Sequence, residues 1–127
     1  MKDYIYFNDE GLLVFPRSDN HALEPLDLVH VEVDGHRIFV WSKHRPRITT
    51  TGSLIRIEIL LPNDPFMRIH NGHLINLSCV ASNNLCGNRG RELIMRYSKS
   101  IALVSDRKAI EFMNRLEAFE NSQILNY

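Results

Sequence analysis

Residues 65–77 have the sequence PFMRIHNGHLINL, which is the most informative stretch of the chain. Apolar residues recur along it at positions that can turn inward: Phe66, Ile69, Leu74, Ile75 and Leu77. The pair Asn71-Gly72 in the middle is the strongest short-range signal for a tight turn between antiparallel strands. The stretch therefore predicts a β-hairpin whose turn lies at Asn71-Gly72.

The polar residues of this hairpin are expected to crowd around its turn: Arg68, His70, Asn71 and His73. Together they offer several hydrogen-bond donors of the kinds that contact phosphate oxygens and base edges. The two histidines also have the His-x-x-His spacing of a metal chelate, but no third ligand with supporting spacing is obvious. We therefore expect no metal and no other cofactor.

Two further hairpins are predicted before this stretch. Apolar runs at residues 4–7 and 12–15 flank a polar tetrapeptide, a pattern typical of a hairpin. Residues 28–33 alternate between apolar and polar, and the Asp34-Gly35 turn signal returns the chain into a partner strand at 37–41. Both predictions favour a protein built of short antiparallel strands.

Two segments of the first half have other patterns. Residues 17–25 are polar and end on a proline, so we expect a loop. Residues 49–61 leave two structures open. Alternating aliphatic residues from Ile55 to Leu61 slightly favour a strand, whereas Ser53 could cap a helix with one apolar face. Pro62 ends the element in either case.

The second half predicts more strands. Residues 77–81 are expected to continue the central strand, and residues 82–90, which are rich in Asn and Gly, to form an exposed loop. Residues 92–97 and 101–104 read as another strand pair.

The last predicted element is a helix. Ser105 is a candidate N-cap, and the apolar residues after it recur at steps of three and four: Ala109, Phe112, Met113, Leu116 and Phe119. Residues 121–127 are expected to be frayed. At 127 residues the chain is expected to be one domain, with a hairpin and loop at 1–25, a core at 26–119 and a tail at 120–127.

The charges balance overall but not locally. Fifteen basic and fifteen acidic residues give a net charge of zero, which excludes a globally basic nucleic-acid binder. Residues 34–56 hold five basic residues and one acidic residue, and residues 86–108 hold six and two. These two blocks could converge on one face, or they could be solvated surfaces with no partner. Charge alone slightly favours solvated surfaces with no partner. The same holds for Lys43, Arg45 and Arg47, which are more often solvated loop residues than phosphate contacts.

Other features bound the class of protein. Cys79 and Cys86 lack the spacing of a zinc site. The simplest interpretation is that both are reduced thiols of an intracellular protein. No signal peptide or membrane-spanning apolar run is visible, so we expect a soluble, cytoplasmic protein. No catalytic motif such as Gly-x-Ser-x-Gly or His-Glu-x-x-His occurs, and the acidic residues are dispersed, so we expect no enzyme.

The central stretch also resembles the LytTR family of bacterial DNA-binding domains. That family has a Phe-x-Arg-x-His segment, a turn, and then two aliphatic residues and Asn, which stand here as residues 66–70 (FMRIH) and 74–76 (LIN). The resemblance extends over residues 26–116. It implies a mainly β fold of short antiparallel hairpins in small packed sheets, with a short connecting helix within 49–61 and a C-terminal helix. It also implies a structural role for His70. We expect Asn76 to be structural as well, because an Asn at a strand end more often fixes a turn through its side chain than contacts a ligand.

The resemblance implies a sequence-specific DNA-binding transcriptional regulator that contacts DNA through loops between strands. The residues that it assigns to DNA are His36, Arg37, Arg68, Asn71, Arg107 and Lys108. The expected partner is double-stranded DNA with paired direct repeats, on which two copies would form a dimer. The length leaves no room for a receiver domain, so a stand-alone domain is expected. Its input would come from a partner regulator or a membrane inhibitor.

One position departs from the family. Asp106 follows Ser105 where the family commonly has an Arg that reads a base, and Arg107 comes one position later. A carboxylate repels phosphates, although it could accept a hydrogen bond from a cytosine amino group or favour the helix N-terminus. The alternative is therefore a protein-interaction module on the same scaffold, which modulates another regulator without reading DNA.

Overall fold

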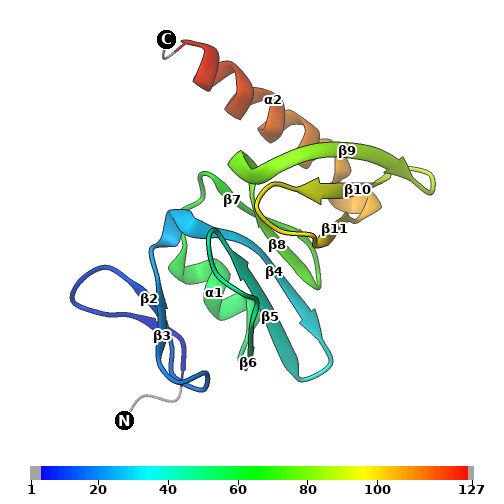
Figure 1. The fold of residues 1–127 in the computed structure, drawn as a ribbon. Helices are drawn as coiled ribbons and strands as arrows, with labels where there is room; N and C mark the ends of the chain where they lie inside the picture. Colours follow the sequence, from blue (N-terminus) through cyan, green and yellow to red (C-terminus); the bar gives the residue numbers. More distant parts are fainter. Residues whose placement is uncertain (1–3, 126–127) are drawn as a thin grey trace.

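A computed structural model describes residues 4–125, with Leu125 described by its backbone alone. Most of its elements are short strands (Figure 1). These are β1 (Tyr6–Phe7), β2 (Leu13–Phe15), β3 (His21–Leu23), β4 (Leu28–Asp34), β5 (Arg37–Ser42), β6 (Ile48–Thr51), β7 (Phe66–His70), β8 (His73–Asn76), β9 (Val80–Cys86), β10 (Gly90–Met95) and β11 (Ile101–Val104). The helices are α1 (Leu54–Leu60) and α2 (Ala109–Leu125), and single 3-10 turns are η1 (Pro25–Asp27), η2 (Leu77–Cys79) and η3 (Asp106–Lys108).

The strands form three antiparallel sheets. The central sheet has five strands in the order β6-β5-β4-β8-β7, and the two smaller sheets have the orders β1-β2-β3 and β11-β10-β9. The predicted central hairpin is confirmed: Arg68 pairs with Leu74 and His70 with His73 around the Asn71-Gly72 turn. The mainly β fold class is thereby confirmed as well. No helix within residues 4–125 is long and apolar enough to cross a membrane.

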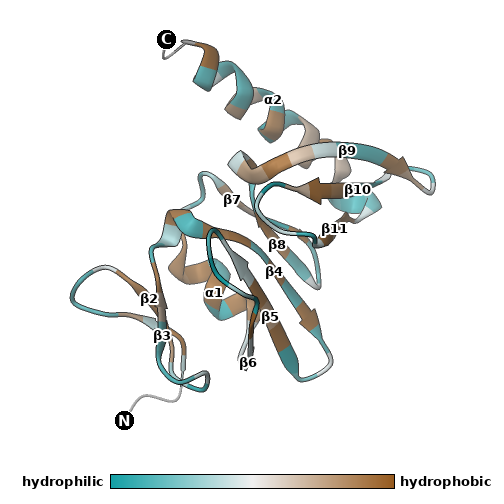
Figure 2. Cartoon of the chain, viewed as in Figure 1, coloured by the Kyte–Doolittle hydropathy of each residue, from teal (hydrophilic) through white to brown (hydrophobic). Residues whose placement is uncertain are grey.

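The central sheet separates two hydrophobic cores. Along β7, Phe66 packs in the first core and Ile69 in the second, and along β8 the same holds for Leu74 and Ile75. Along β4, apolar and polar residues alternate from Val29 to Asp34, whereas β5 has a run of apolar residues in its middle (Figure 2). Both faces of β7 and β8 are therefore buried, although the two strands belong to an antiparallel sheet.

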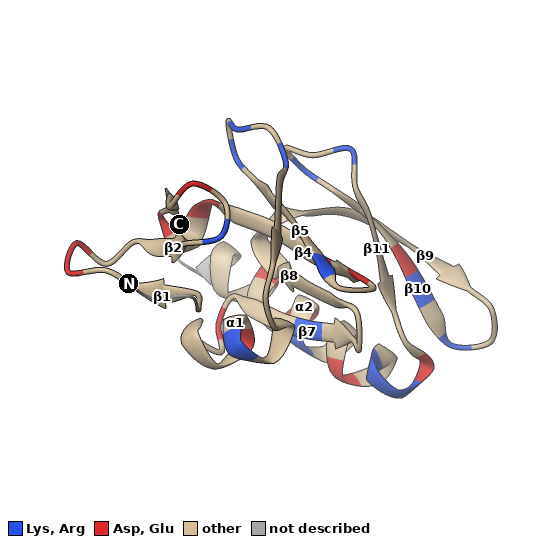
Figure 3. Cartoon of the chain, turned by 90° about the horizontal axis from the view of Figure 1, so that it is seen from below, with Lys and Arg blue, Asp and Glu red and all other residues tan. Residues whose placement is uncertain are grey.

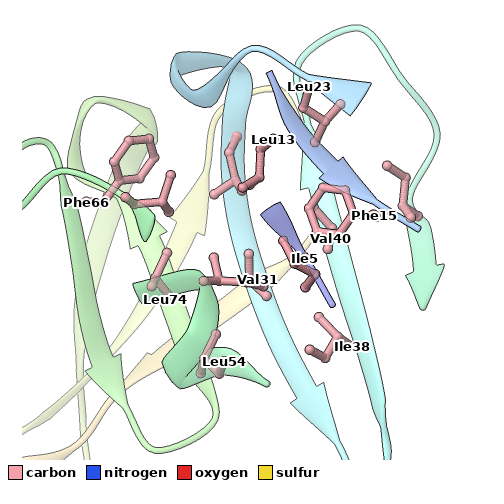
Figure 4. Packing of buried hydrophobic residues seen from close by; sticks show 14 residues of the cluster. Ile5, Leu13, Phe15, Leu23, Val31, Ile38, Val40, Leu54, Phe66 and Leu74 are labelled. Carbon is pink, nitrogen blue, oxygen red and sulfur yellow. The ribbon is translucent and has the colours of Figure 1, made fainter. Parts of the chain in front are cut away.

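The first core lies between the central sheet, the N-terminal sheet and α1 (Figure 4). In the segment that left two structures open, residues 54–60 form the helix α1, as the family resemblance implied, and the alternation of aliphatic residues there did not indicate a strand. The strand β6 ends before this helix begins. The helix begins after Ser53, whose hydroxyl oxygen accepts a hydrogen bond from the backbone N–H of Arg56 at 3.3 Å. It buries Leu54 and Ile57, because residues three apart share one face of a helix.

The second core joins the other face of the central sheet to β9–β11 and α2. Phe112 and Leu93 are completely buried there, and Leu116 is nearly so. The periodic apolar residues of α2 therefore face the core, as predicted. The helix also continues through residues 121–125, where fraying was expected. Residues 126–127 lie outside the described part of the chain.

Three predictions of irregular or extended structure were wrong. The expected loop at 17–25 contains β3, in which His21 pairs with Phe15. The expected strand at 77–81 begins with the 3-10 turn η2. The expected loop at 82–90 is mostly β9, whose residue Leu85 pairs with Arg91. In β9 most side chains are exposed, so the strand lacks the apolar alternation by which strands are found, and its pairing with β10 holds it.

Asn76 has the structural role that was expected. Its side chain is completely buried. The amide nitrogen donates to the carbonyl oxygens of Leu28 at 3.0 Å and Leu26 at 3.4 Å, and the amide oxygen accepts from the backbone N–H of Ser78 at 3.0 Å. Asn76 therefore ties the end of β8 to the start of β4, because it satisfies backbone groups from both segments.

The sequence predicted His73 at an exposed turn, and this prediction was wrong. His73 is buried beside a second histidine. His30 is completely buried, and its Nε2 lies 2.9 Å from Nδ1 of His73. The other ring nitrogen of His30 lies 3.0 Å from the Ser100 hydroxyl, and the ring stacks on Trp41 at 4.9 Å. The interaction joins strands 43 residues apart, which no local pattern in the sequence indicates.

Both buried histidines are neutral in the folded protein at neutral pH. Burial, with a smaller contribution from His73, lowers the pKa of His30 to about 3. Burial, with a smaller contribution from His70, lowers the pKa of His73 to about 4. Glu32 lies 3.8 Å from His73, but burial also raises the pKa of this carboxyl group, so the contact is no strong ion pair. A neutral imidazole can donate to or accept from its neighbour.

The free energy of unfolding should fall as the pH falls below about 6.5. The unfolded histidines take up protons near their ordinary pKa of 6.5, whereas folded His73 and His30 resist protonation until about pH 4 and 3. Stability is therefore complete above pH 6.5 and is lost progressively below it. Urea unfolding between pH 7 and 4 measures this slope. In the double variant His30→Gln, His73→Gln, the free energy of unfolding should depend much less on pH. An unchanged dependence would show that these two histidines are not its cause.

Candidate nucleic-acid interface

Three turns from distant parts of the sequence lie along one edge of the molecule (Figure 1). We call them together the tip edge. They are the β4–β5 turn (residues 34–37), the β7–β8 turn (residues 70–73) and the β11–α2 junction (residues 105–108). Five of the six predicted DNA-contacting residues lie in these turns, and the sixth, Arg68, precedes the second turn.

Two backbone hydrogen bonds fix the three turns to one another. The N–H of Val33 donates to the carbonyl oxygen of Gly72 at 2.9 Å, which joins the first turn to the second. The N–H of Ser105 donates to the carbonyl oxygen of Ile69, also at 2.9 Å, which joins the third to the second. Because both bonds involve backbone atoms of packed strands, the turns have little freedom to move apart.

The second and third turns enclose an open cleft of about 460 Å³. Four of the predicted site residues line it: Arg68, Asn71, Arg107 and Lys108. His70, Ser105, Glu58 and Glu111 complete its lining. The remaining two predicted residues, His36 and Arg37, are exposed on the neighbouring β4–β5 turn and do not line the cleft.

Arg68 braces the β7–β8 turn. One terminal nitrogen of its guanidinium group donates to the carbonyl oxygen of Asn71 at 2.9 Å, and the other lies 3.6 Å from the Glu58 carboxylate on α1. The side chain is only 23% exposed. Its Nε is buried without a hydrogen-bond partner among the described residues. Arg68 therefore faces the cleft from its wall, and does not project from the turn.

The same turn presents Asn71 at its apex. His70 accepts a hydrogen bond on Nδ1 from the backbone N–H of Gly72 at 3.0 Å, which confirms its structural role. The backbone of the turn is thus held by His70, Arg68 and Val33 together. Asn71 itself is exposed. Its side-chain amide can donate and accept at once, which is the pattern needed to recognise a base edge.

The third turn carries adjacent charges of both signs. Arg107 and Asp106 are exposed, and the Nζ of Lys108 lies 3.8 Å from the Glu111 carboxylate. Asp106 begins η3, where a negative charge is favourable beside the N-terminus of a helical segment. Ser105 precedes the helical segment as predicted, but its hydroxyl makes no capping hydrogen bond.

The first turn is the most solvated of the three. The guanidinium group of Arg37 lies 3.9 Å from the Asp34 carboxylate, and both side chains are more than half exposed. The same guanidinium lies over the ring of Phe39, 5.5 Å from its centre. A pair this exposed contributes little to stability, so Arg37 is available to another anion.

Not all basic residues of the 34–56 block reach the tip edge. Lys43 lies at the opposite end of β5, with its Nζ 5.1 Å from the ring centre of Tyr97 in the β10–β11 turn. The length of β5 separates Arg37 from Ser42 by roughly 17 Å, at about 3.4 Å per residue. Arg47 belongs to the same loop as Arg45, but its guanidinium lies over the ring of Phe39 at 4.2 Å, the ring over which Arg37 also lies. Only part of this basic block therefore converges on the tip edge.

Two acidic residues of the cleft were missed from the sequence. Glu111 follows Lys108 by three positions in a helical segment, and that spacing could have indicated the pair. Glu58 reaches Arg68 only because α1 packs beside β7, which no local spacing reports. Among residues 4–125, no group of three or more side chains could hold a metal ion.

Comparisons with known proteins place this geometry in a family. The sequence model of the LytTr DNA-binding domain matches residues 18–117, which is most of the chain. Among solved structures, the fold is similar to the LytTr DNA-binding domain of a methyl-accepting/DNA response regulator from Bacillus cereus, with a TM-score of 0.70. That match has 21% sequence identity and covers 83% of this chain and 95% of the other. No curated protein matches the sequence. The chain belongs to the LytTr DNA-binding domain family.

Proposed function

We propose that this protein is a transcriptional regulator that binds specific sequences of double-stranded DNA through its tip edge. The observation that carries the proposal is the convergence of three turns, rich in guanidinium and imidazole groups, on one edge held by two backbone hydrogen bonds. Membership of a DNA-binding family supports it. The protein would act in the cytoplasm, where it meets DNA.

The turns suit the grooves of B-DNA. A major groove about 12 Å wide admits a two-stranded β-ribbon, and the β7–β8 hairpin ends in such a ribbon. Asn71 at its apex would read a base edge, most favourably that of adenine. Arg107 would contact guanine or a phosphate, and Lys108 a phosphate. His36 and Arg37 would contact the duplex beside them.

Arg68 would have a double role in this complex. One guanidinium nitrogen holds the carbonyl oxygen of Asn71 and so positions the reading side chain. The other faces the cleft, where a phosphate could replace Glu58 as its partner. Asp106 would stay beside the helix N-terminus or accept from a cytosine amino group, and Arg107 would take the place of the usual basic contact.

Two copies would share one binding site in this proposal. Each copy would read one half of a paired direct repeat, and the two would form a dimer on DNA. The signal would reach a stand-alone domain of this kind through a partner regulator or a membrane inhibitor.

Selection of bound duplexes from a random pool should enrich a sequence motif that occurs twice in the same orientation. Affinity for that duplex should fall steeply with salt, with a log–log slope of about −3 or steeper if four cations per copy neutralise phosphates. Fluorescence anisotropy between 50 and 300 mM salt measures the slope. A pool without enrichment, together with an affinity that does not change with salt, would contradict DNA binding. The alternative function, a protein-interaction module, would then be favoured.

Substitutions on the tip edge should separate base reading from phosphate contact. Asn71→Ala should weaken binding to the selected duplex by about tenfold and leave binding to a random duplex nearly unchanged, because a lost base contact costs about 1–3 kcal/mol of discrimination. Arg107→Ala should weaken both complexes if it contacts phosphate.

Arg45→Ala is the matched control for these measurements. Arg45 is exposed in the β5–β6 loop, at the end of β5 opposite to the tip edge, and its removal changes the net charge as Arg107→Ala does. The control should bind both duplexes nearly as the unchanged protein does. An equal loss in Arg45→Ala and Arg107→Ala would contradict the placement of DNA at the tip edge.

A further inference from the structure

We propose that Glu58 and Glu111 act as internal counter-ions of the DNA site, and that they lower its affinity for the phosphates of any duplex. The inference rests on the proposed DNA binding and concerns its regulation. DNA would have to displace these carboxylates from their cations, so that sequence-independent contacts alone bind weakly. Base contacts would then decide where the protein remains bound.

The first carboxylate comes from α1. The helix buries Leu54 and Ile57 against the central sheet, and this orientation places Glu58 at the rim of the cleft. Its Oε1 lies 3.6 Å from a terminal nitrogen of Arg68. The Glu58 side chain is 44% exposed, whereas that of Arg68 is 23% exposed. The carboxylate is therefore the more accessible partner, and it lies on the solvent side of the pair.

The second carboxylate comes from the first turn of α2. Glu111 follows Lys108 by three residues, and the two charged atoms lie 3.8 Å apart. Both residues line the same cleft as Glu58 and Arg68. Two elements that are distant in sequence therefore each supply one carboxylate to one cation of the proposed phosphate-binding surface.

The charges of the cleft nearly cancel. Three cations line it, from Arg68, Arg107 and Lys108, and two carboxylates line it, so the lining carries a net charge of +1 (three minus two) when its histidine is neutral. Figure 3 shows acidic and basic segments alternating over α1, β7 and the start of α2. The Lys108–Glu111 pair is exposed, and such pairs contribute little to folding stability, whereas the Arg68–Glu58 pair is partly buried on its Arg68 side.

A duplex would meet these carboxylates directly. DNA carries one negative charge per about 1.7 Å of its axis, so a phosphate that approaches Arg68 or Lys108 also approaches a carboxylate. Each carboxylate repels the phosphate and competes for the cation. The effect applies to every sequence alike, and it decreases as salt screens the charges.

Neutralising each carboxylate tests the proposal. Glu58→Gln and Glu111→Gln keep the size of the side chain and remove its charge. Each should tighten binding to a random-sequence duplex at 50 mM salt by about three- to tenfold, and the double variant should bind more tightly still. At 300 mM salt the gain should shrink to about twofold or less. Thermal unfolding checks that the variants remain folded.

Glu10→Gln is the matched control. Glu10 is exposed in the β1–β2 turn of the N-terminal sheet and does not line the cleft, so this substitution changes the net charge equally without touching the site. A second comparison places Glu58→Gln in an Arg68→Gln background, where the gain should shrink because the cation that Glu58 neutralises is gone.

The outcomes separate this inference from the proposed function. If the unchanged protein binds its selected duplex but Glu58→Gln and Glu111→Gln gain no more than Glu10→Gln, the counter-ion role is overturned and DNA binding stands. If neither the unchanged protein nor any variant binds a duplex at low salt, DNA binding itself is overturned. A gain confined to the two cleft variants supports the inference.

Discussion

Burial of both faces of the β7–β8 hairpin is the constraint on which the other features depend. Phe66 and Leu74 enter one core, while Ile69 and Ile75 enter the other. A shift of the pairing by one residue would send each set to the wrong core, so the register is strongly determined. The position of the Asn71-Gly72 turn is determined with it. Two packed cores, and not the turn itself, therefore hold the apex in place.

The site follows from this register. Because the hairpin cannot slide, the backbone hydrogen bonds from Val33 and Ser105 bring two other turns to the same edge. Strand interiors are occupied by packing, so exposed polar groups accumulate at the turns, where they can serve recognition. The helices that cover the two faces add Glu58 and Glu111 at the rim. The packing that fixes the three turns therefore also places the two carboxylates of the cleft.

Local patterns predicted the parts of the fold that bury apolar residues regularly. The hairpins at Asp34-Gly35 and Asn71-Gly72 were predicted from alternation and turn residues, and the family resemblance decided for the helix α1. Strand β9 was missed because pairing with β10, and not burial, holds it. The pairs of His73 with His30 and of Glu58 with Arg68 were not predictable, since each joins segments that only the tertiary fold brings together.

In the proposed complex, three separate turns form one surface for a double helix. Backbone amide NMR spectra, recorded while the selected duplex is added, test it most directly. Amide signals of residues 34–37, 70–73 and 105–108 should shift together in proportion to bound DNA. Signals of residues 43–47, at the opposite end of β5, should stay in place. Shifts confined to one turn, or centred on residues 43–47, would show that the three turns do not bind the duplex together.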